Sequence, residues 1–454
     1  MPDGQGMVNV LAQNCAIRDL TFDGNVTTPT GLVRNVDFWS PIDAIMTKNT
    51  TFWVHGGTKG LLIENVTFQH SGGFPVILDA RYADIEDVTF LNCRFLNNRA
   101  HLHGTPGDLN YGSWSGGILW VNDGRTGGKI KNLTVQNCTF ARNTGNCCWG
   151  WSQGFDIMNE NINIAGCYFT DCGLDAVQMD NTLGGGVTGN TFYRIGYIAL
   201  DDSTPAVPKY DGGYSPVAID TSTAKNVTYS FNTIIQANGG GICGDGLCDS
   251  MILNNLILIA APSDALYEID QVGLFGPYGT GNRTFGIETG NSFFPDGANH
   301  LVIKGNTIRN MGMWAIALCN AKNSLVINNT IDHPSTSAGE PIILLCYPGY
   351  DGKNISTLIS GNDEGATPKH RSYNNTITDN VINYSGTRYC VEEEDYSDGA
   401  TIYTFKSTDI NRVYANQITG NSYGEFLKSP NSGSCSDPLA PSRIRRRDDV
   451  VFCS

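Results

Sequence analysis

The sequence contains no long hydrophobic run and has few charged residues. No stretch of 18 consecutive apolar residues occurs in its 454 residues, so no segment is predicted to span a membrane. Charged side chains make up 16% of the chain, and the formal net charge is -15. Because nucleic acids and anionic membranes bind basic patches, this charge argues against both as partners.

Several signature motifs are also absent. The chain has no C-x-x-C pair and no H-E-x-x-H sequence, so we expect neither a metal site nor a cofactor. The N-terminal sequence MPDGQGMVNV lacks a charged region followed by an apolar region, so no signal peptide is predicted, and an upstream segment or cap is expected to precede it. No long apolar stripe with a period of 3.6 residues occurs, which disfavours helices.

What the sequence does contain is a repeat with a period in the twenties, clearest over residues 152–202. Phe169 and Phe192 are 23 residues apart, and each is the second of two apolar residues spaced by five. A glycine and a third apolar strand follow each doublet, as in GLDAVQM from Gly173. The doublets are Ile17/Phe22, Ile63/Phe68, Phe90/Phe95, Val135/Phe140, Ile164/Phe169, Val187/Phe192, Tyr229/Ile234, Leu253/Leu258, Ile303/Ile308, Val326/Ile331, Ile377/Ile382 and Val413/Ile418.

Short β-branched or aromatic runs at such a period, separated by Gly and Asn, are typical of a stacked β-solenoid. Three strands per repeat predict an all-β fold: a single-stranded right-handed parallel β-helix with three sheets and about 12 or more coils. We expect residues 1–428 to form this β-helix with inserted loops. Residues 429–454, which are rich in Pro, Ser and Arg, are expected to form a C-terminal tail or cap.

Cysteine occurs 14 times, which favours an oxidising compartment and hence a secreted or extracellular protein. Several cysteines hold one station of the repeat, two residues before the second apolar anchor, where other repeats have asparagine. We interpret this station as a buried turn ladder of free thiols and amides. Its members are Cys93, Cys138, Cys167, Asn190, Asn232, Asn306, Asn329, Asn380 and Asn416. Disulfides are predicted between Cys243 and Cys248 and between Cys435 and Cys453.

Aromatic residues gather in segments that look like insertions between coils. Trp120 lies in 98–128, Trp149 and Trp151 lie in 143–153, and Tyr210 and Tyr214 lie in 202–217. Loops on one face of a solenoid usually form its binding surface, and aromatic rings suit the apolar faces of sugars. We therefore predict that these five residues bind substrate. The alternative is that the rings only pack their loops against the coils.

Carboxylates crowd where successive repeats end. Asp180, Asp201 and Asp202 follow the apparent third strands of adjacent coils, and Asp156 and Asp175 each lie two residues after a glycine. Stacked coils place equivalent positions about 4.8 Å apart, and crowded carboxylates raise one another's pKa. Such pairs supply the acid and the base or nucleophile of glycoside cleavage. The alternative is structural, because aspartate side chains often cap turns.

The region around these residues resembles known proteins. The chain is similar to the pectate-lyase-like superfamily of right-handed β-helices over nearly its whole length, and QGFDIMNENINIAGCYFTDCGLDAVQM is similar to the polygalacturonase-type glycoside hydrolases. Gly154-Phe155-Asp156 matches the end of their N-T-D-G-F-D motif, and Asp175 matches the second residue of their D-D pair. Gln153 and Leu174 replace the first aspartate of each motif, and no G-H-G or R-I-K follows. These departures argue against a standard polygalacturonase.

Together, these patterns predict an extracellular glycoside hydrolase that cleaves a polysaccharide or oligosaccharide with paired aspartates. The first rival is a polysaccharide lyase or epimerase, which needs a basic side chain near the carboxylates. The second is a glycan-binding adhesin, tailspike or surface fibre without catalysis, for which a homotrimer and a virion surface are open alternatives. A fold of this class serves all three functions, so it determines the class of substrate better than the reaction.

Overall fold

The computed structural model describes residues 8–25, 51–99, 116–152, 154, 156–199, 202–203, 205–208, 216–244, 246–259, 285–289, 298–309, 315–319, 321–333, 343–346, 374–384, 391–393 and 417–419. These residues form parallel strands in three long sheets, and one short antiparallel pair. The part of the chain that the structure describes contains no helix long and apolar enough to cross a membrane.

The three long sheets, A, B and C, each contain one strand from nearly every coil. Sheet A contains β1 (Val8–Val10), β4 (Phe52–His55), β7 (Val76–Asp79), β10 (Ile118–Asn122), β13 (Cys148–Ser152), β16 (Val177–Met179), β21 (Val217–Thr221), β25 (Gly240–Gly244), β29 (Phe285–Thr289), β33 (Ile316–Cys319), β37 (Ile343–Cys346) and β40 (Val391–Glu393). Sheet B contains β2 (Gln13–Arg18), β5 (Lys59–Glu64), β8 (Ile85–Leu91), β11 (Ile130–Gln136), β14 (Asn159–Ala165), β17 (Thr182–Thr188), β23 (Thr228–Ser230), β27 (Met251–Leu253), β31 (Val302–Lys304), β35 (Leu325–Ile327), β38 (Thr376–Thr378) and β41 (Gln417–Thr419). Sheet C contains β3 (Thr21–Asp23), β6 (Thr67–Gln69), β9 (Arg94–Leu96), β12 (Thr139–Ala141), β15 (Tyr168–Cys172), β18 (Thr191–Ile195), β24 (Thr233–Ala237), β28 (Leu256–Leu258), β32 (Thr307–Arg309), β36 (Thr330–His333) and β39 (Val381–Tyr384).

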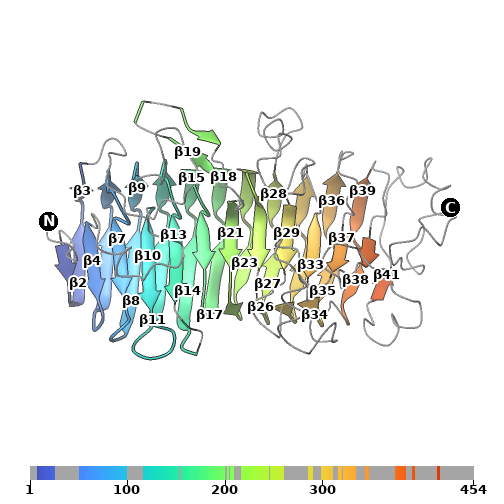
Figure 1. Cartoon of the computed structure of the whole chain (residues 1–454), viewed down its shortest axis with the longest axis horizontal. Coiled ribbons are helices and arrows are strands. Elements are labelled where there is room, and N and C mark those ends of the chain that lie inside the picture. Colours follow the sequence, from blue (N-terminus) through green and yellow to red (C-terminus); the bar gives the residue numbers. More distant parts are fainter. Residues whose placement is uncertain are drawn as a thin grey trace, which may run out of the picture.

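Two small sets of strands complete the architecture. Four two-residue strands extend sheet B at one end of its strands: β22 (Ala224–Lys225), β26 (Leu247–Cys248), β30 (Ala298–Asn299) and β34 (Ala321–Lys322). The short strands β19 (Tyr197–Ile198) and β20 (Val207–Pro208) pair antiparallel as a hairpin. Figure 1 shows this hairpin projecting from the stack beside β15 and β18.

Each coil runs through sheets A, B and C in turn, and the next coil adds a parallel strand to every sheet. The coils therefore stack in sequence order, from blue to red in Figure 1. This arrangement confirms the predicted all-β parallel β-helix with three sheets, and the 12 described strands of sheet A confirm the expected number of coils.

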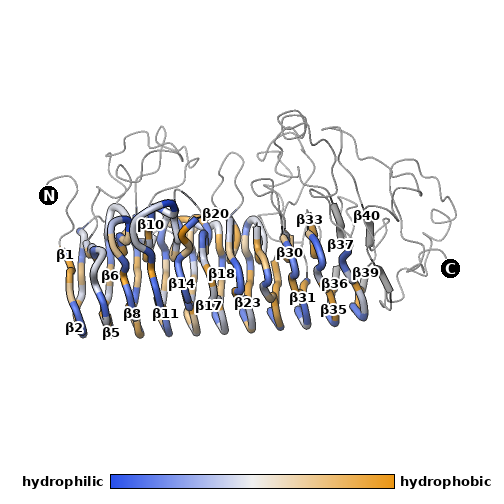
Figure 2. The backbone as a smooth tube through the Cα atoms, turned by 90° about the horizontal axis from the view of Figure 1, so that it is seen from below, coloured by the Kyte–Doolittle hydropathy of each residue, from blue (hydrophilic) through white to orange (hydrophobic). Residues whose placement is uncertain are grey.

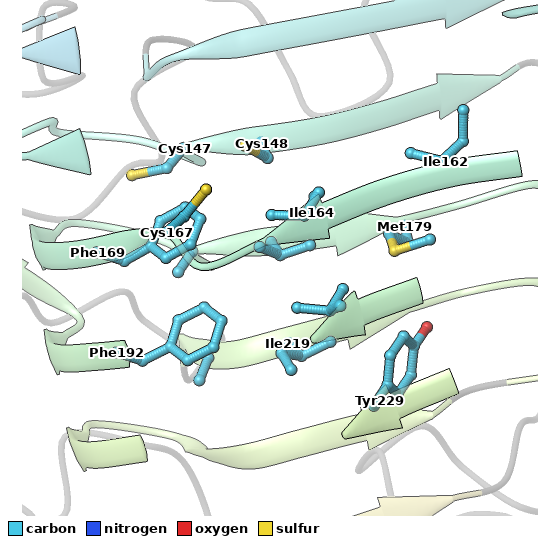
Figure 3. Close-up of a cluster of buried hydrophobic side chains, with 14 of the residues drawn as sticks. Cys147, Cys148, Ile162, Ile164, Cys167, Phe169, Met179, Phe192, Ile219 and Tyr229 are labelled. Carbon is cyan, nitrogen blue, oxygen red and sulfur yellow. The ribbon is translucent and has the colours of Figure 1, made fainter. Parts of the chain in front are cut away.

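The core fills the inside of the coils, because apolar and polar residues alternate along the strands. Figure 2 shows this alternation around each coil. The second anchors of the doublets form a stack of phenylalanine rings, with centroids 4.6 Å apart between Phe95 and Phe140 and 4.7 Å apart between Phe140 and Phe169. Figure 3 shows Phe169 and Phe192 one above the other in this stack. Residues at equivalent positions of the sequence repeat therefore stack on one another as a column in the core.

The predicted ladder of buried thiols and amides is also present. Amide groups of one coil bond to the same station of the next: Cys93 N lies 3.3 Å from Cys138 Sγ, and Cys167 N donates to Asn190 Oδ1 at 2.8 Å. Asn255, which was not among the predicted members, joins the ladder between Asn232 and Asn306. Asn416 lies outside the described residues. The ladder satisfies backbone groups in the turn between sheets B and C, where no strand partner exists.

Removing one amide from this ladder is expected to destabilise the stack. The Asn232 side chain accepts from Asn190 N and donates to Val187 O, at 3.0 and 2.9 Å, and only 1% of the residue is exposed. Asn232→Ala leaves both backbone groups buried without that partner, so we expect it to lower the free energy of unfolding by about 1–3 kcal/mol. Denaturant titration followed by circular dichroism measures this loss. Asn163→Ala on the exposed face of β14 is the control, and an equal loss there would contradict the ladder's role.

The structure corrects two of the predicted anchor pairs. Ile252 and Ile257, rather than Leu253 and Leu258, align with the preceding anchors and are buried. Apolar residues adjoin each other there, so the sequence does not reveal which one points inward. Ile418 aligns with Ile377 in sheet B instead of forming a second anchor in sheet C.

Two segments expected to be insertions contain strands. Segment 143–153 contains β13, and segment 98–128 contains β10. The apparent third strand at residues 198–200 is replaced by β21, because β19 leaves the coil to pair with β20.

The predicted disulfides are not confirmed. Cys243 in β25 and Cys248 in β26 are both thiols in the structure. Cys435, Cys453 and the whole of residues 429–454 lie outside the described residues, so the predicted pairing and the boundary of the C-terminal tail stay predictions.

Candidate functional site

The candidate site lies on the outer face of sheet A, at strands β13, β16 and β21. In β16, Val177 and Met179 belong to the core, so the alternate residues Gln178 and Asp180 point outward. By the same alternation, Ile219 of β21 points inward and Asp220 points outward. Strand β13 presents Trp149 and Trp151, which pack in a separate apolar cluster outside the core.

Parallel register places these outward side chains side by side. Trp149 pairs with Gln178, and Gln178 pairs with Asp220, so the three form a row across neighbouring coils. Asp180 lies two residues beyond Gln178 in the same direction. The strand spacing and the rise per residue then separate the Cα atoms of Asp180 and Asp220 by about 8 Å along the diagonal.

Asp180 is held by neutral hydrogen-bond donors. Its Oδ2 accepts from Gln178 Nε2 at 2.8 Å, and its Oδ1 accepts from the backbone N–H of Ser222, also at 2.8 Å. Gln178 is held in turn by Asn146, whose Nδ2 donates to Gln178 Oε1 at 2.7 Å. The chain of bonds therefore fixes the carboxyl group of Asp180 relative to two neighbouring coils.

The pKa of Asp180 is raised to about 6. Burial raises this pKa because the charged form loses hydration, and the hydrogen bonds from Ser222, Trp149 and Gln178 lower it by a smaller amount. The side chain is only half-buried, so it stays within reach of a ligand. A carboxyl group with these properties is protonated for part of the time near neutral pH and can act as a general acid.

Asp220 is a candidate site residue that the sequence pattern did not predict. The repeat predicted that the third strand after Phe192 ended at residue 200. Instead the chain leaves the coil after β19 and returns to sheet A only at Val217, and we call this intervening segment the excursion. The alternation in Val217-Ala-Ile-Asp-Thr carried the signal of a strand with an outward aspartate. Its place beside Gln178 became visible only once the excursion had been recognised.

Asp175 and Asp156 lie in different surroundings. Asp175 is fully buried, and its Oδ1 accepts from the backbone N–H of Val217 at 2.8 Å, so it ties adjacent coils together. This placement fits the structural alternative considered from the sequence. Asp156 is exposed in the bend before β14.

Asp202 lies at a different corner of the coil from Asp180. Its Oδ1 is 2.7 Å from Nη1 of the fully buried Arg99, and its Oδ2 is 3.2 Å from His70 Nε2. His70 and Arg99 follow strands of sheet C, whereas Asp180 follows β16 of sheet A. The expected cluster of Asp180 with Asp202 therefore does not form, because Asp202 begins the excursion instead of ending a sheet A strand. Asp201 lies outside the described residues.

The fold gives different surroundings to the three predicted sugar-binding aromatic residues that the structure describes. Trp120 of β10 is fully buried inside the coil, so it is part of the core and not of the outer face. Trp149 is 3% exposed and packs against Phe74, while the neighbouring Trp151 is partly exposed. Tyr210 and Tyr214 lie outside the described residues.

No group of three His, Cys, Asp or Glu side chains among the described residues could hold a metal ion. The expectation of no cofactor stays a prediction, since nothing in the structure tests it.

Comparisons with known proteins agree on the fold. A family model described as "right handed beta helix region" matches residues 8–192. No curated protein matches the chain significantly. Among solved structures, the A-module of a mannuronan C-5 epimerase from Azotobacter vinelandii is similar with a TM-score of 0.51 and 12% identity, covering 92% of this chain and 91% of that one.

Two further solved structures are similar at lower TM-scores. A surface adhesin of Streptococcus pneumoniae has a TM-score of 0.47 and 15% identity, with coverage of 73% of this chain and 70% of that one. A GH136 lacto-N-biosidase from Eubacterium ramulus has a TM-score of 0.43 and 12% identity, with coverage of 65% of this chain. This chain spans about half the length of that enzyme, 48%. At such identities the likeness concerns the fold, and the activity has to be argued from the site.

Proposed function

We propose that this chain, which has a right-handed parallel β-helix fold, is a glycoside hydrolase acting on a polysaccharide. The observation that supports this most is the half-buried carboxyl group of Asp180, whose pKa is raised to about 6, diagonally opposite Asp220. Two carboxyl groups with different surroundings are what glycoside cleavage needs.

In the proposed reaction, protonated Asp180 donates its proton to the leaving glycosidic oxygen. Asp220 acts as the base and removes a proton from the water molecule that attacks the anomeric carbon from the opposite face. Inverting enzymes keep their two carboxyl groups about 6.5–9.5 Å apart to leave room for this water, and Asp180 and Asp220 are offset diagonally on neighbouring strands instead of lying directly side by side. The proposal therefore includes inversion at the anomeric carbon.

The tryptophans beside the carboxylates supply a surface for the sugar. Trp151 is partly exposed on the same face as Asp180, one coil earlier, and packs in the same apolar cluster as Trp149. A sugar ring has an apolar face rimmed by hydroxyl groups, so it stacks on such a ring. A chain of sugars lying across β13, β16 and β21 then places one linkage between Asp180 and Asp220.

A lyase or epimerase is less well supported by the contacts of Asp180. Elimination from a uronate needs a base and a cationic group that neutralises the substrate carboxylate. The described donors to Asp180 are the amide of Gln178, the backbone and side chain of Ser222, and Trp149, none of which is cationic. We propose that the partner is a polysaccharide and that the protein acts on it outside the cell.

We expect activity to fall on the alkaline side of about pH 6. The general acid Asp180 must be protonated, so kcat/KM should decrease about tenfold per pH unit once the pH rises above the raised pKa. The measurement is reducing-end release from a panel of neutral and uronic-acid polysaccharides between pH 4 and pH 9, with the anomeric product followed by NMR.

Three other outcomes would each contradict the proposed hydrolase and favour a different function. Release that increases into the alkaline range, together with the ultraviolet absorbance of an unsaturated product, would support a lyase. A change in the sugar's configuration without cleavage would support an epimerase. Binding to one glycan without turnover on any of them would support the adhesin.

A further inference from the structure

Two buried cysteines approach each other more closely than two separate thiols normally do. Cys147 and Cys172 are thiols in the structure, as Cys243 and Cys248 are, but their Sγ atoms are 2.7 Å apart and neither residue is exposed. The pair is also distinct from the thiol ladder of Cys93, Cys138 and Cys167, in which the sulfurs of Cys138 and Cys167 each accept from a backbone N–H of the preceding coil. We propose that Cys147 and Cys172 form a disulfide that links two consecutive coils.

The link would connect the strands that carry the candidate site. Cys147 immediately precedes β13, which presents Trp149 and Trp151, and Cys172 ends β15, from which the chain turns toward β16 and Asp180. The two coils already meet here, since Cys147 N donates to Asp175 O. Figure 3 shows the sulfur of Cys147 directed away from the neighbouring Cys148, so the two adjacent cysteines have different surroundings.

The polar contacts of the two sulfurs are long and weak, so a disulfide would lose little by giving up the S–H that Cys172 donates to Thr170 O. Cys147 Sγ lies 3.8 Å from Asn143 Nδ2, and Cys172 Sγ lies 3.9 Å from Thr170 O. A disulfide sulfur can still accept from Asn143. The pair would close a loop between residues 25 positions apart in the sequence, which is long enough for the cross-link to restrict the unfolded chain.

The bond forms by exchange with a small-molecule or protein disulfide. One cysteine, as its thiolate, attacks the oxidant's disulfide and releases one thiolate of the oxidant. The second cysteine then attacks this mixed disulfide and releases the other. The oxidant gains two electrons, the two cysteines lose two protons and two electrons, and one S–S bond is formed.

Oxidation has to precede the closing of the coils. Burial raises the pKa of the Cys172 thiol well above its usual value, so the folded chain contains little of the reactive thiolate. The disulfide therefore forms while the chain folds, in a compartment that contains a thiol oxidant.

The test compares protein exported to the bacterial periplasm with protein made in the cytosol. Each sample is unfolded in an alkylating reagent without reductant and cleaved after aromatic residues, several of which separate Cys147 from Cys172. We expect the exported protein to yield the two cysteine peptides joined, two hydrogens lighter than their sum, and Cys93, Cys138 and Cys167 alkylated. Cys148→Ser should leave this joined pair intact.

A stability measurement separates the cross-link from simple packing. Reductant present throughout folding is expected to lower the Tm of the wild type by several degrees. Cys172→Ala should have an equally low Tm that reductant does not change. Alkylation of both Cys147 and Cys172 when the exported wild type is unfolded in the reagent would overturn the proposal, and so would a Tm that responds to reductant equally in wild type and variant.

Discussion

Asp180→Asn is expected to lower kcat/KM by about 10²–10⁴-fold on any polysaccharide that the wild type cleaves. The amide keeps the size of the side chain and can still accept from Ser222 N, but it cannot donate a proton to the leaving oxygen. Asp220→Asn should cause a comparable loss, because the attacking water then lacks its base. Both effects are measured by reducing-end release under the same conditions.

Glu160→Gln is the matched control for loss of a carboxylate. Glu160 lies on β14 on the outer face of sheet B, where it pairs with Lys129, so its loss should leave turnover unchanged. An Asp180→Asn variant that retains more than half of the wild-type activity would show that the site lies elsewhere.

A pH series that compares the Tm of the Asp180→Asn variant with that of the wild type tests the raised pKa of Asp180. Because the folded-state pKa of Asp180 is raised, its contribution to stability is present below pH 3.8 and lost as the pH rises through about 6. The Tm of the variant relative to the wild type should therefore increase between pH 4 and pH 8. A difference that stays constant with pH would contradict the raised pKa.

Phe140→Ala is expected to cause the largest loss of stability, about 3–5 kcal/mol. The ring is fully buried and lies between Phe95 and Phe169, with interplanar angles of 4° and 6°. Removing it opens a cavity in the middle of the stack, and rings above and below cannot close the gap while their strands stay paired. The measurement is the free energy of unfolding from urea titration.

The control is Tyr168→Ala, on the neighbouring coil of the same sheet. Tyr168 points outward and is 40% exposed, so its loss should change the free energy of unfolding by about 0.5 kcal/mol or less. Because each coil contacts only its neighbours, the effect of Phe140→Ala can appear as early unfolding of the coils around β12. A loss below about 1 kcal/mol would contradict the packing of the stack.

The candidate site combines a predicted residue with one that was not predicted. Asp180 follows an apolar strand that the repeat located correctly, so its position on the outer face could be inferred. Asp220 could not be paired with it, because an excursion separates them and no periodicity predicts where the chain returns to sheet A. Because Asp202 lies in the same excursion, it contacts Arg99 and His70 instead of lying next to Asp180.

The tryptophans illustrate a second limit. In Ile118-Leu-Trp-Val-Asn, all five residues are buried, so the sequence has no alternation that indicates the inner face. Register with neighbouring coils places Trp120 inside, beside Leu78 and Gly150, and places Trp149 outside. Only the neighbouring strands decide which side of a doubly buried strand points inward.

The stacked architecture of this protein follows from its amino-acid sequence alone. Side chains of one repeat must pack on those of the next. The fold can therefore be predicted from residues that recur once per repeat, namely the apolar doublets, the glycines and the Cys or Asn station. The groups that meet between coils are known only from the folded chain: Asp180 with Ser222 and Gln178, Asp220 beside Gln178, and the sulfurs of Cys147 and Cys172. These contacts depend on the length of the excursions and on the register between strands, and neither follows from the pattern within a single coil.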